Sequence, residues 1–188
     1  MEKKEKQEFL ELAYSKEELG NIIVKNRMLG IEKRLGIKLV VKENKLVINK
    51  TKCKLNDFEL MNMLDAWALC FKKEAFLLED PDWLFEKINL RSMIRPARLK
   101  TVRARIIGKK GKTKRVLQEL TNCYFIISKN HIGIIGKQEN MHVAKRAIER
   151  LIRGKRHEAV YSALQREARE IEEKQKLTEE QLKEIEEE

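Results

Sequence analysis

Apolar residues follow two periods along the chain, and the two periods alternate in blocks. Alternation, as in Cys123, Phe125 and Ile127, is typical of a half-buried strand, whereas a spacing of three or four is typical of one helix face. The predicted strands are residues 9–14, 36–41, 46–48, 87–94, 123–128 and 131–136. Helices are predicted from about residue 16, and over about 55–71, 96–108, 112–121 and 141–153.

Several residues mark where these elements begin and end. Ser15 and Glu18 have the spacing of a capping box, so a helix is expected from Lys16. Pro96 suits the first turn of a helix, and a break at Asp80-Pro-Asp predicts a short helix capped by Asp80 or Asp82. Beyond Gly154 a charged helical run turns acidic, which fits either a solvated helix or an acidic docking peptide.

The helix and hairpin pattern occurs twice, because residues 16–48 match residues 102–134 at a constant offset of 86. The matched pairs include Ile31 with Leu117, Gly36 with Asn122, Leu39 with Phe125, Leu46 with Ile132 and Ile48 with Ile134. This indicates two domains of one type, with a chance likeness between two helix–hairpin units as the alternative.

Charge is spread unevenly over these parts. The chain of 188 residues has a net charge of +11. Residues 91–170 hold 21 Lys/Arg and 6 Asp/Glu, whereas residues 1–90 hold 17 and 16, and residues 171–188 hold 3 and 8. Such a localised positive segment is the electrostatic footprint of a phosphate-binding face.

Candidate catalytic or metal chemistry is absent from the pattern. The 3 cysteines and 3 histidines are scattered, which predicts neither disulfides nor a metal site. No nucleophile–base or carboxylate pair stands out, so we expect a protein that is not an enzyme and needs no cofactor. Without a secretory h-region or a membrane-length apolar run, a cytoplasmic location is expected.

The candidate binding chemistry lies in Gly108-Lys-Lys-Gly111, between two predicted helices. Glycine lets another backbone approach closely, and the surrounding lysines and arginines indicate an anionic ligand. The rival interpretation is a nucleotide-binding P-loop ending at Lys112-Thr113. That motif requires a glycine where Ile106 stands, and a buried strand where residues 98–105 are basic.

With the alternating strand that follows Asn122, this loop resembles the Gly-x-x-Gly clamp of KH domains, which grips single-stranded nucleic acid. The chain also resembles, through Gly108–Gly111, Gly154-Lys-Arg-His157 and Val160-Tyr161, the archaeal two-KH-domain small-subunit ribosomal RNA processing proteins, the partner of Nob-one family. The resemblance implies an α+β fold of two tandem type I (eukaryote-type, β-α-α-β-β-α) KH domains with a C-terminal charged helix.

The implied domains are residues 8–80, 87–154 and 155–188: a degenerate KH domain, a KH domain with the clamp, and a helical extension with an acidic tail. The first domain has Ile22-Ile-Val-Lys25 where the clamp would be. The predicted RNA-binding residues are Arg103, Arg105, Ile106, Ile107, Gly108, Lys109, Lys110, Gly111, Lys112, Thr113, Lys114 and Arg115. Ile106, Ile107 and Leu117 are expected at or near the apolar floor of the groove, with Leu117 as an alternative core residue.

The resemblance implies binding to the 3′ end of small-subunit (16S) ribosomal RNA during ribosome biogenesis. It also implies contact with the endonuclease that trims this RNA and with the alpha subunit of initiation factor two. The alternative hypothesis is an adaptor between pre-ribosome or translation-initiation partners, for which RNA binding is secondary.

Overall fold

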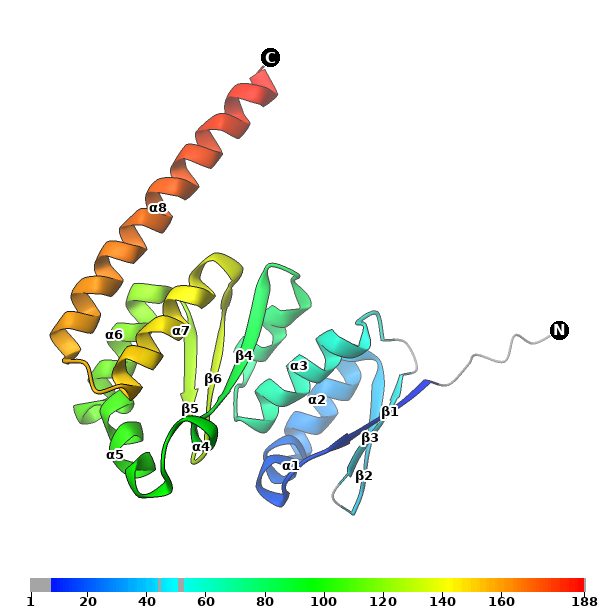
Figure 1. Ribbon diagram of the computed structural model, residues 1–188. Coiled ribbons are helices and arrows are strands. Elements are labelled where there is room, and N and C mark those ends of the chain that lie inside the picture. The colour runs from blue at the N-terminus through cyan, green and yellow to red at the C-terminus, as the bar shows by residue number, and fades with distance from the viewer. Residues whose placement is uncertain (1–7, 44, 51–52, 188) are drawn as a thin grey trace. The chain divides into compact units, whose positions relative to one another are not determined.

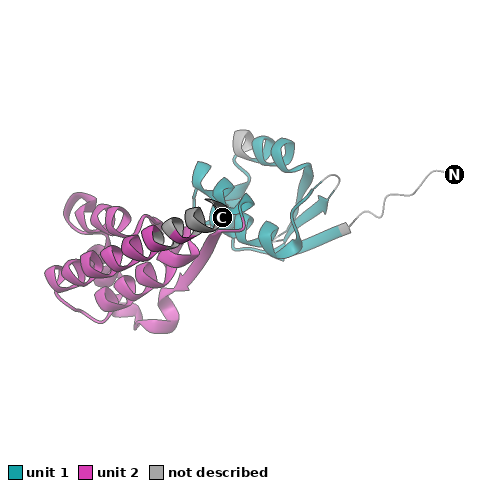
Figure 2. Cartoon of the chain, turned by 90° about the horizontal axis from the view of Figure 1, so that it is seen from above, with its two compact units in different colours: residues 1–80 teal, residues 81–188 magenta. Residues whose placement is uncertain are grey.

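A computed structural model describes residues 8–43, 45–50 and 53–187 (Figure 1). The chain divides into two compact units, residues 1–80 and residues 81–188 (Figure 2). Each unit contains one three-stranded antiparallel sheet covered by helices. Among the described residues, no helix combines the length and the apolar character needed to cross a bilayer.

Unit 1 runs in the order strand, two helices, two strands, helix. Its elements are β1 (Glu8–Ala13), α1 (Lys16–Ile22), α2 (Lys25–Leu35), β2 (Ile37–Lys42), β3 (Lys45–Lys50), α3 (Asp57–Ala68) and a 3-10 helix, η1 (Lys73–Glu79). The central strand is β3, with β1 and β2 antiparallel on its two sides.

Local hydrogen bonds explain where the helices of unit 1 begin and end. The backbone N–H of Glu18 donates to Ser15 Oγ at 3.3 Å, and the N–H of Ser15 donates to Glu18 Oε2 at 3.0 Å. This is the expected capping box. Asn56 and Glu59 form a second one, so α3 begins later than the apolar period predicted. Gly36 ends α2 with a φ of 64°, a left-handed conformation that costs glycine little.

Unit 2 has the same order of strands, with additional helices. Its elements are β4 (Trp83–Asn89), α4 (Leu90–Met93), α5 (Pro96–Ile107), the 3-10 turn η2 (Lys109–Gly111), α6 (Lys112–Thr121), β5 (Tyr124–Ile127), β6 (His131–Lys137), α7 (Gln138–Ile152) and α8 (His157–Glu187). The central strand is β6, flanked by β4 and β5. The helices expected to end at Gly108 and to span 112–121 are confirmed.

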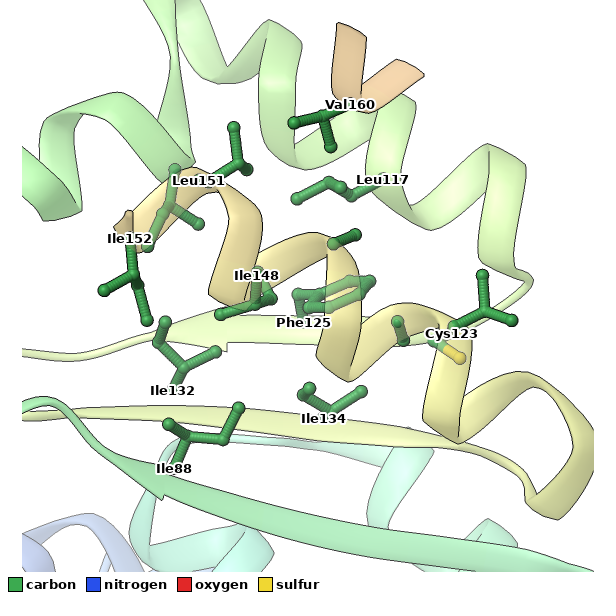
Figure 3. Close-up of a cluster of buried hydrophobic side chains, with 14 of the residues drawn as sticks. Ile88, Leu117, Cys123, Phe125, Ile132, Ile134, Ile148, Leu151, Ile152 and Val160 are labelled. Atoms are coloured by element: carbon green, nitrogen blue, oxygen red, sulfur yellow. The ribbon is translucent and has the colours of Figure 1, made fainter. Parts of the chain in front are cut away.

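The core of unit 2 joins its sheet to its helices (Figure 3). Phe125, Ile132 and Ile134 on the inner sheet face pack with Leu117 of α6 and Ile148 of α7. Each of these side chains is at most 1% exposed. Truncating such a residue to alanine typically costs about 2–5 kcal/mol, so this core holds the helices that carry the loop in fixed positions.

The first strand of unit 2 lies earlier than the sequence predicted. A strand was expected over 87–94, but β4 ends at Asn89 and the short helix α4 follows. The Asn89 Oδ1 atom accepts a hydrogen bond from the N–H of Arg91 at 2.9 Å, which caps this turn. Leu90 and Ile94 are both buried at a spacing of four, so this apolar run follows the helical period.

The short helix expected at the break between the units was also wrong. Neither Asp80 nor Asp82 caps a helix, because β4 begins at Trp83. The short helix of this region, η1, precedes the break and ends at Glu79. The Asp80-Pro-Asp sequence therefore leads directly into a strand.

Candidate nucleic-acid interface

The turn between α5 and α6 is built from left-handed backbone conformations. Gly108 has φ 75° and ψ 170°, Lys110 has φ 51° and ψ 31°, and Gly111 has φ 76° and ψ 10°. The angles of Gly108 fall in a region that is essentially restricted to glycine, and a left-handed lysine is itself uncommon. These angles reverse the chain within one turn and leave a short exposed tip.

The two glycines are required for different reasons. A Cβ atom on Gly108 would lie 2.7 Å from the backbone nitrogen of Thr113, which is far inside van der Waals contact. A Cβ on Gly111 would meet nothing within 4 Å, so only its positive φ favours glycine there. Gly108 therefore closes the loop onto α6, while the space over Gly111 is open to a ligand.

The tip of the loop carries unneutralised positive charge. Lys109 and Lys110 are exposed, and neither has a carboxylate partner among the residues that the structure describes. Lys112 and Arg115 on the first turns of α6 are exposed as well. Ammonium groups held beside an open glycine backbone suit a phosphate chain, because the backbone of the ligand can approach while its charges are met.

The other predicted site residues divide by burial. Ile106 and Leu117 are 0% exposed and belong to the core, so neither lines an exposed surface beside the loop. Thr113 is also buried. The half-buried members are Arg103, Arg105, Ile107, Gly108, Gly111 and Lys114. Of the three residues expected at the groove floor, Ile107 alone retains accessible surface.

The chain is similar to known proteins over most of its length. The model of the eukaryotic type KH domain (KH domain type I) matches residues 84–169. A KH domain-containing protein of Methanocaldococcus jannaschii is 30% identical over 168 residues, which cover 85% of this chain and 74% of that protein. The chain belongs to the PNO1/Dim2-type family of KH-domain proteins.

Two further members of this family carry descriptive names. The pre-rRNA-processing protein PNO1 of Chaetomium thermophilum is 25% identical over 139 residues. The match covers 70% of this chain and 54% of the longer PNO1 protein. A chain of the crystallised a/eIF2alpha–aDim2p–rRNA complex from Pyrococcus horikoshii OT3 is 28% identical, with a TM-score of 0.77. That match covers 89% of this chain and 97% of the other.

Within this PNO1/Dim2-type KH domain, residues at the start of α8 form hydrogen bonds with the helices on both sides of the loop, and we call these contacts the brace. Tyr161 Oη donates a hydrogen bond to Thr113 Oγ1 at 3.1 Å, beneath Gly108. His157 Nε2 lies 3.1 Å from the backbone oxygen of Arg105, and the Arg105 guanidinium donates to the backbone oxygen of Lys155. Arg105, predicted as an RNA ligand, is thus also an internal tether.

Sequence reasoning missed Tyr161 and His157 as supports of the loop. They lie 48 and 52 residues along the chain from their partners, so no local period relates them. The Tyr161 hydroxyl was nevertheless detectable as a polar group on the helix that also buries Val160 and Leu164. A hydroxyl held at the edge of a core needs a partner, and Thr113 is that partner.

The one cysteine of unit 2, Cys123, is buried. Burial raises the pKa of the Cys123 thiol to about 11, although a hydrogen bond with the side chain of Thr121 opposes the shift. The thiol is therefore neutral and a poor nucleophile at physiological pH. Across the described parts of the chain, no three His, Cys, Asp or Glu residues are grouped as a metal site.

Proposed function

We propose that this chain binds single-stranded RNA through the Gly108–Gly111 clamp, and that its target is the 3′ end of small-subunit ribosomal RNA during ribosome biogenesis. The loop geometry is the observation that carries the proposal, because an open Gly111 and two unpaired lysines sit on a rigid helical frame. The rRNA present in the Pyrococcus complex of a similar chain supports the choice of target.

In this mechanism the protein holds RNA and performs no chemistry on it. Phosphates lie against the loop, where Lys109 and Lys110 meet their charge. Bases lie over the surface between α5, α6 and β5, which includes the accessible part of Ile107. Bases in such a groove are read through their Watson–Crick edges, which requires a single strand. The edge-reading groups belong to β5 and the residues that flank it.

We also propose that unit 1 is a degenerate KH domain, over residues 8–80, in tandem with the clamp-bearing domain over residues 87–154. The strand orders β1-β3-β2 and β4-β6-β5 support this, because the two sheets have equivalent connections. Unit 1 has Ile23 and Val24 at the clamp position, so it does not grip RNA in this way. Residues 155–188 then form an extension whose first turns brace the clamp.

A second candidate function is that of an adaptor between proteins. The association of a similar chain with a/eIF2alpha in the Pyrococcus complex favours it. On this hypothesis the alpha subunit of initiation factor two, or the endonuclease that trims the ribosomal RNA, is the principal partner. Such an adaptor would still co-purify with its partner after nuclease treatment, whereas an association mediated by RNA would be lost.

A salt titration on matched single- and double-stranded RNA tests the proposed function. A KH clamp holds about four nucleotides, so roughly three to five phosphates are neutralised. At about −0.7 per phosphate, log affinity against log salt should have a slope of about −2 to −3.5 for the single strand. Duplex RNA should bind more weakly, because its base edges are paired. Equal affinity for the two forms would reject the groove mechanism.

A further inference from the structure

The clamp uses only part of the positive charge of its segment. Residues 87–118 contain 12 Lys/Arg and no Asp or Glu. Several of these cations lie far from the loop, at the other end of α5. Arg91 on α4, and Arg95 and Arg98 at the start of α5, are all exposed. None of the interactions described for the clamp involves them.

Hydrogen bonds place the first of these arginines, Arg91, beside the turn between β5 and β6. The Nε atom of Arg91 donates to Asn130 Oδ1 at 3.0 Å, and the N–H of Leu90 donates to the backbone oxygen of Asn130 at 2.8 Å. These bonds hold α4 against the turn between β5 and β6, as Figure 1 shows. Lys129, the neighbour of Asn130, is exposed on that turn. Arg91 and Lys129 therefore lie at one corner of unit 2, and Arg95 and Arg98 follow Arg91 in the chain at the start of α5.

The charges of this corner are not neutralised within the protein. Arg91, Arg95, Arg98 and Lys129 form no ion pair with a carboxylate in the described parts of the chain. The first turn of α5 has no acidic residue, and cations at that end of a helix oppose the helix dipole. This arrangement disfavours the folded state and is relieved by an external anion.

We propose that Arg91, Arg95, Arg98 and Lys129 form a second contact for the phosphate backbone of the RNA that the clamp holds. This α4–α5 basic cluster rests on the proposed function, and it extends the bound strand beyond the groove. Arg98 precedes Gly108 by ten residues, or about 15 Å along α5. A strand of about four nucleotides fills the clamp and leaves the cluster unoccupied. Arginine suits the role because its planar fork matches phosphate oxygens.

Strand length separates the cluster from the clamp in a binding experiment. The full chain and the variant Arg95→Glu with Arg98→Glu are titrated with a single strand of about four nucleotides and with one of about twelve that contains it. The variant should bind the short strand like the wild type and the long strand roughly tenfold more weakly. Loss of two phosphate contacts should make the salt slope on the long strand shallower by about 1.4.

A matched control and a stability measurement exclude indirect effects. Arg166→Glu with Arg169→Glu makes the same charge change at exposed positions of α8, and it should preserve the affinity for the long strand. Because glutamate at the start of a helix favours its dipole, the cluster variant should unfold at the wild-type temperature or above it. Lys129→Glu in the turn should give a smaller loss that also appears with the long strand alone.

Two outcomes would overturn the cluster as an RNA contact. One is unchanged affinity of the variant for the long strand. The other is an equal loss on both strands, which would show a general electrostatic effect. Failure of the wild-type chain to bind either strand is a different result, because it would refute the proposed function and this contact together.

Discussion

At equivalent positions of the strand–helix–helix frame, units 1 and 2 present opposite surfaces. In unit 2 the turn between the two helices has three residues with positive φ and two exposed lysines. In unit 1 the corresponding turn has Ile23 at φ −76° and Val24 at φ −49°, and these apolar side chains are 37% and 52% exposed. One turn leaves room for an approaching backbone, and the other fills that room.

The difference shows that the frame and the clamp depend on separate residues. Ile22, at the position of Gly108, is completely buried and contributes to the core of unit 1. In unit 2, Gly108 has no side chain, and Thr113 occupies the space that a Cβ atom at this position would need. A change at this one position therefore alters both the packing under the turn and the conformation available above it.

The largest expected effect comes from placing a β-branched side chain, like that of Ile22 in unit 1, at Gly108 in the loop of unit 2. Gly108→Val forces a Cβ to within 2.7 Å of the Thr113 nitrogen and requires a φ of 75°. We expect a loss of about 3–5 kcal/mol in the free energy of unfolding, from overpacking and backbone strain together. Gly111→Ala, which strains φ alone, should cost about 1–2 kcal/mol. Denaturant titrations check both values, and equal losses would contradict the assigned role of Gly108.

A smaller effect is expected from the brace behind the loop. Tyr161→Phe removes the donor to Thr113 Oγ1 and should destabilise unit 2 by about 1 kcal/mol. The looser loop should bind RNA about three- to fivefold more weakly, since ordering it then costs binding energy. Faster amide hydrogen exchange over residues 108–112 would report the cause. Ser162→Ala, which removes the hydroxyl of the neighbouring exposed residue on α8, is the control and should change neither quantity.

The last effect is confined to alkaline pH and concerns the neutral thiol of Cys123. Its pKa of about 11 exceeds the ordinary value of 9.0, so the thiol favours the folded state below pH 9 and loses that contribution as pH rises through 11. Between these pH values the wild type should lose about 2–3 kcal/mol more stability than Cys123→Ala. Denaturation at both pH values checks this. Parallel losses in the two proteins would place the pKa of the thiol near its ordinary value.

Where the sequence predicted the structure, short-range signals decided the outcome. The ends of α5 and α6 follow from Pro96, Gly108 and the left-handed Asn122, each of which acts within one turn. The capping box at Ser15 has the same local character. Alternation of Cys123, Phe125 and Ile127 was sufficient to place β5, because each second residue faces the same core.

Where prediction failed, the decision depended on tertiary contacts. The apolar run before Pro96 fits a strand or a helix by period, and the bonds of Leu90 and Arg91 to Asn130 favour the helix. The sequence also could not separate Ile106 from Ile107, since only packing against α7 and the sheet makes one buried and the other half-buried. The brace from Tyr161 depends on a contact between distant segments.

The central claim is that the loop of unit 2 grips RNA and that of unit 1 does not. It is tested by placing aspartate at the same two positions of each loop. Lys109→Asp with Lys110→Asp is compared with Ile23→Asp with Val24→Asp, all at exposed positions. The affinity of the intact chain for single-stranded RNA should fall about a hundredfold in the first variant and remain near wild type in the second. Equal affinities of the two folded variants would contradict the claim.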